Sequence, residues 1–184
     1  EYMYLPDYVY KAFKRAKKTK NSESISLIKN ENILLNFKEK EIKTQWYNPF
    51  FIFSIILLLT LVITFRDQKR NKRSKWVDFS LFFVTGLVGL LICFLWFFTD
   101  HFTAPNNFHF LWAFAPNICI SFILLKKKLP SWVSKYIKGY LLLLSLTIFV
   151  SVIGIQQFSF AVLPVIAMLF VRNFYLYKLL TSKK

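Results

Sequence analysis

The chain has 184 residues, of which 55% are hydrophobic, and it carries a formal net charge of +16. A soluble domain of this length could not cover so much apolar surface, and a nucleic-acid-binding domain would spread its basic residues over folded faces. Here the basic residues and the apolar runs hardly overlap, because long apolar stretches alternate with short polar ones between residues 49 and 177. A lipid bilayer sorts residues in this way, so the pattern indicates an integral membrane protein with no nucleic-acid partner.

Residues 1–48 differ in kind from the rest of the chain. The sequence LPDY, which begins at Leu5, favours a helix start, with proline in the first turn and an acidic residue near the positive end of the helix dipole. Apolar residues at 25–28 and 33–35 flank a polar turn at 30–32 and predict two short strands. This part is too short to be a domain, so we expect it to be the α+β remnant and linker of a globular domain further upstream.

Residues 49–184 contain five apolar segments, and we predict that each forms a transmembrane helix. The segments run over residues 49–65, 79–98, 108–125, 139–155 and 158–177. A helix rises about 1.5 Å per residue, so segments of this length span a hydrocarbon core of about 30 Å. Only Gln156 and Gln157 separate the last two segments, and we expect a tight turn there because their combined length is far too great for one crossing. The predicted fold is an all-α membrane bundle of about five helices after a short α+β remnant.

Four residues inside these segments depart from a plain apolar helix. Arg172 lies near the end of the fifth segment, where its long side chain can snorkel to the lipid headgroups. Pro164 lies inside the same segment and predicts a kink. Cys93 and Cys119 lie in apolar surroundings without a metal or disulfide spacing, so we expect them to pack as small hydrophobic residues.

The basic residues between the apolar runs and toward the end of the last one predict the orientation. Fifteen of them lie within residues 66–76, 126–138 and 172–184, whereas residues 99–107 and 156–157 contain none. Because short loops rich in Lys and Arg stay in the cytoplasm, we expect a cytoplasmic C-terminus and, with five crossings, an N-terminal segment outside. The lysines of that segment do not change this expectation, since large domains translocate largely regardless of charge.

The polar residues best suited to chemistry fall in the predicted outer loop. Residues 99–109 contain both histidines of the chain, His101 and His109, together with Asp100. A carboxylate beside an imidazole can act as a general base with its orienting group, or bind a lipid headgroup. The same three side chains could coordinate a metal, but their spacing matches no metal signature, so we expect none.

On the residues alone, a purely structural interpretation of this loop is favoured over the chemical one. Thr99 and Asp100 would end one helix, and Asn106 or Asn107 would cap the next one, as polar residues between helices commonly do. The sequence contains no Ser-His-Asp set, Gly-rich phosphate loop or paired carboxylate elsewhere. We therefore expect no cofactor, and no catalytic residue of this chain outside the loop.

The outer loop also carries a recognisable pattern. It reads Thr99-Asp100-His101, then NFHFLW from Asn107 to Trp112, and then Pro116. This resembles the transmembrane domain of the Lnb-type lipoprotein N-acyltransferases, whose pattern is close to T-D-H, then N-x-N-L-L-W, then P. The LPDY sequence resembles the end of that family's periplasmic domain, which comes just before five transmembrane helices.

The chain departs from the family pattern at two positions. His109 stands where asparagine is usual, and Phe110 stands where leucine is usual. The family's role for an asparagine side chain therefore does not carry over to His109, although an imidazole can still donate or accept a hydrogen bond.

The resemblance implies a function in the bacterial inner membrane, with the N-terminal segment periplasmic. The enzyme would transfer an acyl chain to the free amino group of a lipoprotein's N-terminal cysteine, from a membrane phospholipid or the lipoprotein's own glycerolipid. The main catalytic groups are expected in the missing upstream periplasmic domain, which the transmembrane domain would anchor while holding acyl chains at the outer leaflet. The candidate catalytic residues here are Asp100 and His101, and the candidate substrate-binding residues are Thr99, Asn106, Asn107, His109 and Trp112.

Two other functions remain open from the sequence. The segment could be a non-catalytic membrane anchor that holds an exported domain. It could also be a transporter or channel subunit, but such proteins use intramembrane charges or broken helices with internal repeats, and the five segments contain almost no charge. We expect the transporter function least.

Overall fold

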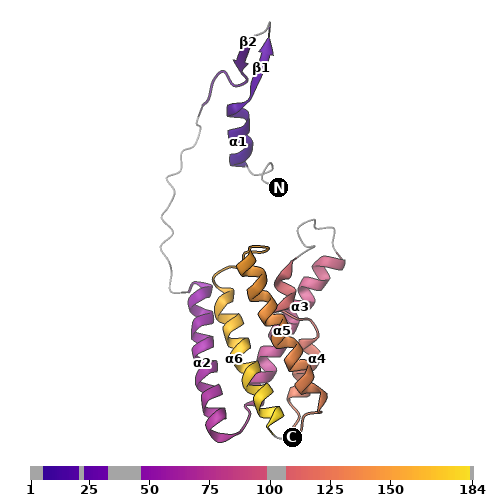
Figure 1. Cartoon of the computed structure of the whole chain (residues 1–184). Coiled ribbons are helices and arrows are strands. Elements are labelled where there is room, and N and C mark those ends of the chain that lie inside the picture. Colours follow the sequence, from indigo (N-terminus) through magenta and orange to yellow (C-terminus); the bar gives the residue numbers. More distant parts are fainter. Residues whose placement is uncertain (1–5, 21–22, 33–46, 99–106, 183–184) are drawn as a thin grey trace. The chain divides into compact units, whose positions relative to one another are not determined.

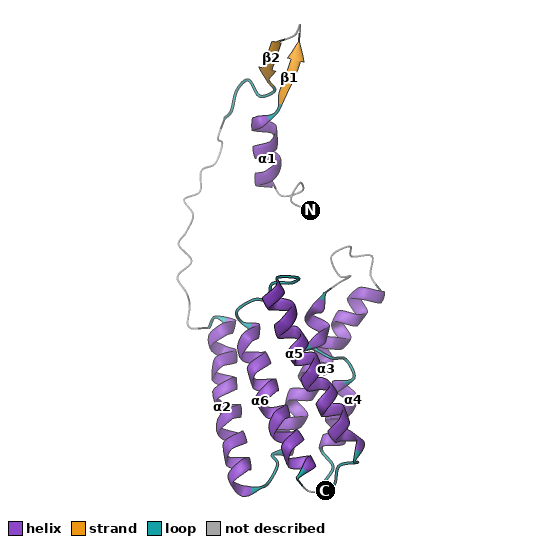
Figure 2. Cartoon of the chain, viewed as in Figure 1, coloured by secondary structure: helices purple, strands orange, loops and turns teal. Residues whose placement is uncertain are grey.

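The computed structural model describes residues 6–20, 23–32, 47–98 and 107–182 (Figure 1). The protein divides into two compact units, which are described separately: unit 1, Glu1–Lys43, and unit 2, Thr44–Lys184. Among the described residues, strands occur only in unit 1, and unit 2 is built from helices and their connections (Figure 2). The fold class predicted from the sequence, a helical membrane bundle after a short α+β segment, is confirmed.

Unit 1 contains one helix and one hairpin. Helix α1 (Pro6–Arg15) begins at the proline, as the sequence predicts. Strands β1 (Lys17–Lys20) and β2 (Glu23–Ser26) pair antiparallel. The first predicted strand, residues 25–28, is confirmed only in part, because β2 ends at Ser26. Its described partner is the upstream strand β1, where Thr19 faces Ser24 in a favourable cross-strand pair. The second predicted strand, residues 33–35, lies outside the described residues.

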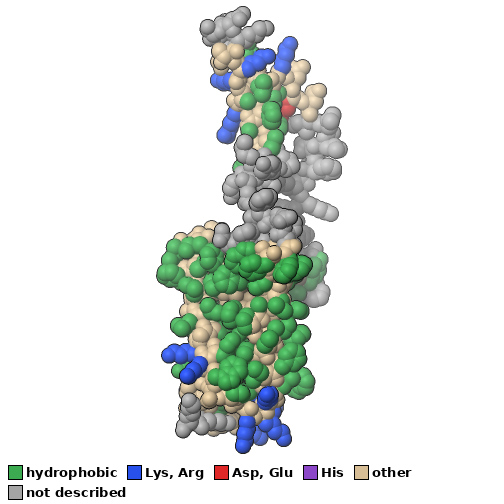
Figure 3. Space-filling model, turned by 90° about the vertical axis from the view of Figure 1, so that its right-hand side faces the viewer, with side chains coloured by type: hydrophobic (Ala, Val, Ile, Leu, Met, Phe, Trp, Pro, Cys, Tyr) green, Lys and Arg blue, Asp and Glu red, His purple; other side chains and the backbone are tan. Residues whose placement is uncertain are grey.

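Four helices of unit 2 are long and apolar enough to cross a membrane. They are α2 (Pro49–Arg70), α3 (Lys75–Phe97), α5 (Trp132–Ile153) and α6 (Val162–Thr181). Each has 20 to 23 residues, and at about 1.5 Å per residue it matches a hydrocarbon core of about 30 Å. Hydrophobic side chains cover the visible face of unit 2, and Lys and Arg side chains gather toward its lower end (Figure 3). The chain is a multi-pass membrane protein.

Local sequence explains where several of these helices begin and end. The side chain of Asn48 caps α2 by accepting a hydrogen bond from Phe50 N at 3.1 Å, and Pro49 occupies the first helical position. Helix α5 ends at Gly154, whose φ of 81° is the left-handed conformation that glycine adopts without strain. The predicted break between the fourth and fifth segments is therefore present, but the connection runs over residues 154–161 and is not a tight turn at Gln156 and Gln157.

Pro164 lies in the first turn of α6 and not in its interior. A proline there costs no helical hydrogen bond, because the first N–H groups of a helix have no partner within it. The kink predicted from an interior position is therefore wrong.

The third apolar segment is not one continuous helix. It forms a 3-10 turn, η2 (Phe108–Leu111), and then an eight-residue helix, α4 (Asn117–Leu124), about 12 Å long. Proline at position 116 separates the two, because it cannot continue a helix and disfavours helical backbone in the residue before it. The prediction of an uninterrupted helix over residues 108–125 is wrong in this respect.

Two glycines of α3 allow the broken segment to pack closely. A Cβ atom added at Gly86 would lie 2.2 Å from Ile118 N, and one added at Gly89 would lie 2.2 Å from Ala113 O. Ala113 is fully buried. Non-helical backbone is tolerated at membrane depth where protein surrounds it, and α3 provides that cover.

The core of unit 2 lies between α3, α4, α5 and α6, while α2 packs on α6. The bundle has two ends with different side chains. We use "loop end" for the end that holds Asn48, η2 and residues 154–161. We use "basic end" for the end that holds residues 71–75 and 125–131, with the lysines that follow α2 and α4.

Candidate functional site

Of the loop that the sequence singles out, residues 99–109, the structure describes only the end, residues 107–109. Among the candidate residues, Thr99, Asp100, His101 and Asn106 lie outside the described residues. Asn107, His109 and Trp112 are described, and all three lie in or beside η2 at the loop end. These three residues belong to the part of the chain where the loop enters the third segment.

Asn107 caps η2, as the structural interpretation of the loop predicts. Its Oδ1 accepts a hydrogen bond from His109 N at 3.1 Å. Gln156, from the connection between α5 and α6, approaches the same turn: its Oε1 accepts from Phe108 N at 2.7 Å, and its Nε2 lies 3.4 Å from Asn107 Oδ1. Gln156 thus links the connection between α5 and α6 to the loop that carries Asn107. The sequence analysis missed this role because it treated Gln156 only as part of a turn.

His109 is held on two sides. Its Nδ1 accepts a hydrogen bond from Trp112 Nε1 at 2.8 Å, and its ring lies edge-on to Phe158 with 4.8 Å between centroids. An imidazole that accepts at Nδ1 and is neutral carries its hydrogen on Nε2. That hydrogen is a donor suited to a phosphate or carbonyl oxygen.

Trp112 connects this group to the core. Its backbone oxygen accepts a hydrogen bond from Tyr140 Oη of α5 at 2.6 Å. We refer to Asn107, His109, Trp112, Tyr140 and Gln156 as the His109 cluster. The cluster brings together three residues predicted as substrate-binding, Asn107, His109 and Trp112. Hydrogen bonds hold them to α5 and to the connection between α5 and α6.

A second polar cluster surrounds Arg172, which is fully buried. Its Nε donates to Asp78 Oδ1 at 2.6 Å, and its Nη2 donates to Asp67 Oδ2 at 2.8 Å. Its Nη1 donates to Thr64 Oγ1 at 3.1 Å. The prediction that Arg172 snorkels to the headgroups is wrong, because two carboxylates inside the bundle satisfy the guanidinium and offset its loss of hydration.

Arg73 and Ser74 extend this cluster to the basic end. Arg73 Nη1 lies 3.3 Å from Asp78 Oδ2. Ser74 donates to Asp67 through both its backbone N and its Oγ, each at 2.8 Å. Helices α2 and α3 extend past the predicted apolar runs and include Asp67 and Asp78, so the bundle holds more buried charge than the runs themselves contain. The sequence signal was an arginine in one apolar run and an aspartate just beyond the end of two others.

These charges do not make a transport site. Each of them is paired, and the cluster adjoins the connection between α2 and α3 at the basic end. Substrate and ion sites of secondary transporters lie near the bilayer midplane, where broken helices meet. Within the described ranges, no three His, Cys, Asp or Glu side chains form a group that could hold a metal.

Comparison with protein families matches residues 40–184 to the Lnb transmembrane domain. The chain belongs to this family. The match covers all of unit 2 and confirms the resemblance carried by the outer-loop pattern and the order of the apolar segments. No curated protein and no solved structure matches the chain.

As an Lnb transmembrane domain, the chain has two polar regions with different characters. The His109 cluster is a set of neutral hydrogen-bonding groups next to the loop that carries Asp100 and His101 in sequence. The Arg172 cluster is a set of paired charges that joins α2, α3 and α6. The first can orient or bind a polar ligand, whereas the second holds helices together.

Proposed function

We propose that this chain is the membrane domain of a lipoprotein N-acyltransferase. It would anchor a periplasmic catalytic domain and position lipid for acyl transfer to the N-terminal cysteine of a lipoprotein. The observation that carries this proposal is the family match over residues 40–184.

The charge distribution supports an orientation for this function. Cytoplasmic loops carry an excess of Lys and Arg. The basic end would therefore be cytoplasmic and the loop end periplasmic, in the bacterial inner membrane. The segment before α2 would then enter the membrane on the side where lipoproteins are modified.

The chemistry of acyl transfer indicates what the loop end could contribute. The amino nitrogen attacks the acyl carbonyl and forms an amide bond, while the ester bond of the donor breaks. The nitrogen must lose a proton and the leaving oxygen must gain one, which a positioned acid–base pair assists. Asp100 and His101 would assist or position this step, next to a His109 cluster that holds the following turn in place.

The test uses the complete protein with Asp100→Asn or His101→Ala. We expect lipoprotein N-acylation, measured by mass spectrometry of N-terminal lipopeptides, to fall by about 100-fold, while the amount of protein in the membrane stays unchanged. Gln157→Ala, at an exposed position of the connection between α5 and α6 at the same end, is the control and should keep its acylation. Normal acylation in both test variants would leave the loop with a capping role only.

A further inference from the structure

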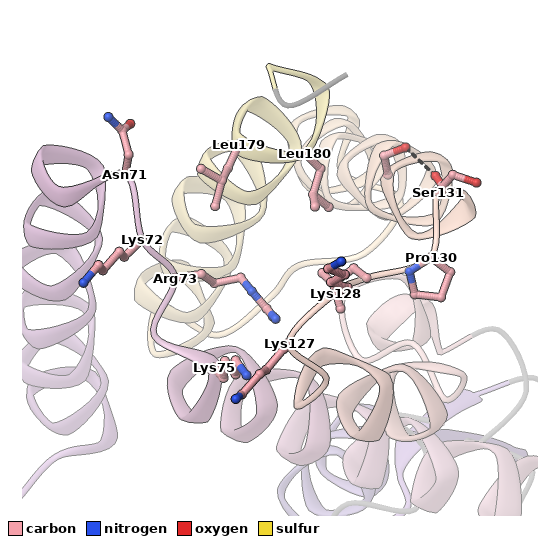
Figure 4. A pocket seen from close by; sticks show the side chains of 12 residues that line it. Asn71, Lys72, Arg73, Lys75, Lys127, Lys128, Pro130, Ser131, Leu179 and Leu180 are labelled. Atoms are coloured by element: carbon pink, nitrogen blue, oxygen red, sulfur yellow. Dashed lines mark hydrogen bonds between the residues drawn. The ribbon is translucent and has the colours of Figure 1, made fainter.

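A cavity of about 740 Å³ opens at the basic end of the bundle (Figure 4). Three parts of the chain line it: the connection between α2 and α3, the connection between α4 and α5 with the start of α5, and the last turns of α6. The cavity is thus assembled by the fold and does not belong to a single loop. It lies at the opposite end of the bundle from the His109 cluster.

The lining of this cavity is strongly basic. It includes Lys72, Arg73, Lys75, Lys127 and Lys128, and no Asp or Glu side chain. Among the described residues, no carboxylate forms an ion pair with any of these four lysines. Figure 4 shows the side chains of Lys75, Lys127 and Lys128 gathered on one side, with Arg73 reaching toward them. An anion in the cavity would meet several uncompensated positive charges.

Hydrogen bonds hold the basic connections in place before any ligand arrives. Arg73 donates to Leu124 O at 2.8 Å and to Lys126 O at 3.0 Å, which joins the connection after α2 to the one after α4. Tyr175 Oη of α6 donates to the backbone oxygen of Lys72. A site that is organised in advance loses less entropy when it binds a ligand.

Apolar groups at the same place point to a lipid. Leu129, Leu179 and Leu180 form part of the lining. Trp76 and Trp132, next in sequence to lining residues, expose 72% and 45% of their surface. Exposed tryptophans at helix ends mark the depth of the lipid headgroups, where a phosphate and the beginning of an acyl chain occur together.

We propose that this cavity binds the phosphate headgroup of an anionic phospholipid, with its glycerol and upper acyl chain against the leucines. The positive-inside bias requires a number of basic residues at this end, but not their convergence around one cavity with an apolar wall. This lipid would be bound at the end opposite the proposed acyl-transfer site. It is therefore distinct from the acyl donor.

The test compares two triple variants of the purified chain that remove the same charge. Lys75→Gln/Lys127→Gln/Lys128→Gln alters the cavity, and Lys135→Gln/Lys138→Gln/Lys178→Gln alters exposed lysines toward the same end that do not line it. Native mass spectrometry in detergent, with phosphatidylglycerol titrated against phosphatidylcholine, measures lipid affinity. We expect the cavity variant to bind phosphatidylglycerol roughly 10- to 100-fold more weakly, and the control to stay within about threefold of the unaltered chain.

Ser131→Glu is a second variant that keeps every lysine and places a negative charge at the cavity. We expect it also to weaken phosphatidylglycerol binding, and this result separates charge in the cavity from any misfolding of the triple variant. An equal loss in the two triple variants, unchanged binding in Ser131→Glu, or equally tight binding of phosphatidylcholine would each overturn the proposal. Inorganic phosphate is also tested as a competitor. If it displaces the lipid when present at the same concentration as the lipid, the cavity is a site for a free anion, and the proposal is overturned.

Discussion

Arg172 is the buried charge that joins three helices of unit 2. Its guanidinium contacts Asp67 of α2 and Asp78 of α3 from its place on α6, and none of its side chain reaches solvent. Burial of an isolated charge in a bilayer is costly, so the two carboxylates and the guanidinium depend on one another. The guanidinium uses separate N–H donors for the two carboxylates, Nε for Asp78 and Nη2 for Asp67. Only arginine has several N–H donors fixed in one plane.

Removal of this guanidinium should destabilise the bundle strongly. Arg172→Met leaves Asp67 and Asp78 inside without their main partner, and we expect a loss of about 3–5 kcal/mol in the free energy of unfolding. Denaturant unfolding in detergent micelles, followed by circular dichroism, measures the loss. Lys178→Met, an exposed position on the same helix, is the control and should change stability by less than about 0.5 kcal/mol. Similar unfolding of the two variants would contradict the role given to Arg172.

Gln156 supports the turn that carries His109. Gln156→Leu leaves the backbone N–H of Phe108 without its acceptor, which we expect to cost about 1–3 kcal/mol locally. Hydrogen–deuterium exchange of residues 108–111 should therefore become about tenfold faster or more. Gln157→Leu, at the exposed neighbouring position, should leave this exchange unchanged. An equal effect of both substitutions would show that the hydrogen bond does not hold the turn.

At the scale of secondary structure, the third apolar segment depends on α3. The segment is broken before Asn117, and its exposed backbone groups need close cover from a neighbouring helix. Gly86 and Gly89 lie one helical turn apart and provide that cover, because neither has a side chain to hold the two backbones apart. The packing of α3 and α4 thus follows from two small residues and one proline.

A methyl group at Gly86 should disturb this contact. The added Cβ would lie 2.2 Å from Ile118 N, so the backbone must move, and we expect Gly86→Ala to cost at least about 1–3 kcal/mol of unfolding free energy. Thermal unfolding in detergent gives the comparison. Gly139→Ala on α5 meets no atom within 4 Å and should be neutral or stabilising by up to about 1 kcal/mol. The account of this packing would be wrong if both alanines had the same effect.

The sequence predicts the helices of unit 2 better than their interactions. Length and hydropathy determine where α2, α3, α5 and α6 lie, because the bilayer demands about 20 apolar residues whatever their neighbours. Hydropathy averaged over a window does not reveal Pro116, which breaks the third segment, because one proline hardly lowers the mean of an apolar window. The averaged hydropathy also cannot show that Arg172 has partners, because these partners lie about 100 positions away in the sequence.

In the candidate site, too, the sequence predicts local features better than contacts between distant residues. Asn107 as a cap was predictable, because a polar residue before an apolar run commonly fills that place. The bond from Gln156 was not, since it joins two connections that only the folded bundle brings together. Thr99, Asp100, His101 and Asn106 lie outside the described residues, so their roles stay predictions from the sequence.

At the scale of the whole membrane domain, the two ends have different chemistry. The loop end presents neutral hydrogen-bonding side chains around His109, and the basic end presents an uncompensated cationic cavity. The bundle between them is held by an apolar core and by the buried Arg172 cluster. This division is consistent with the two proposals, acyl transfer at the loop end and lipid binding at the basic end.

The most direct measurement of the central claim is lipoprotein N-acylation by a chimera. In the complete protein, residues 47–184 are replaced by an unrelated five-helix anchor of the same orientation, and acylation is compared with that of the unaltered protein at equal membrane levels. The account predicts that acylation falls to background, because the membrane domain positions lipid for the reaction. Acylation retained at the normal level would contradict it and leave residues 47–184 as an anchor alone.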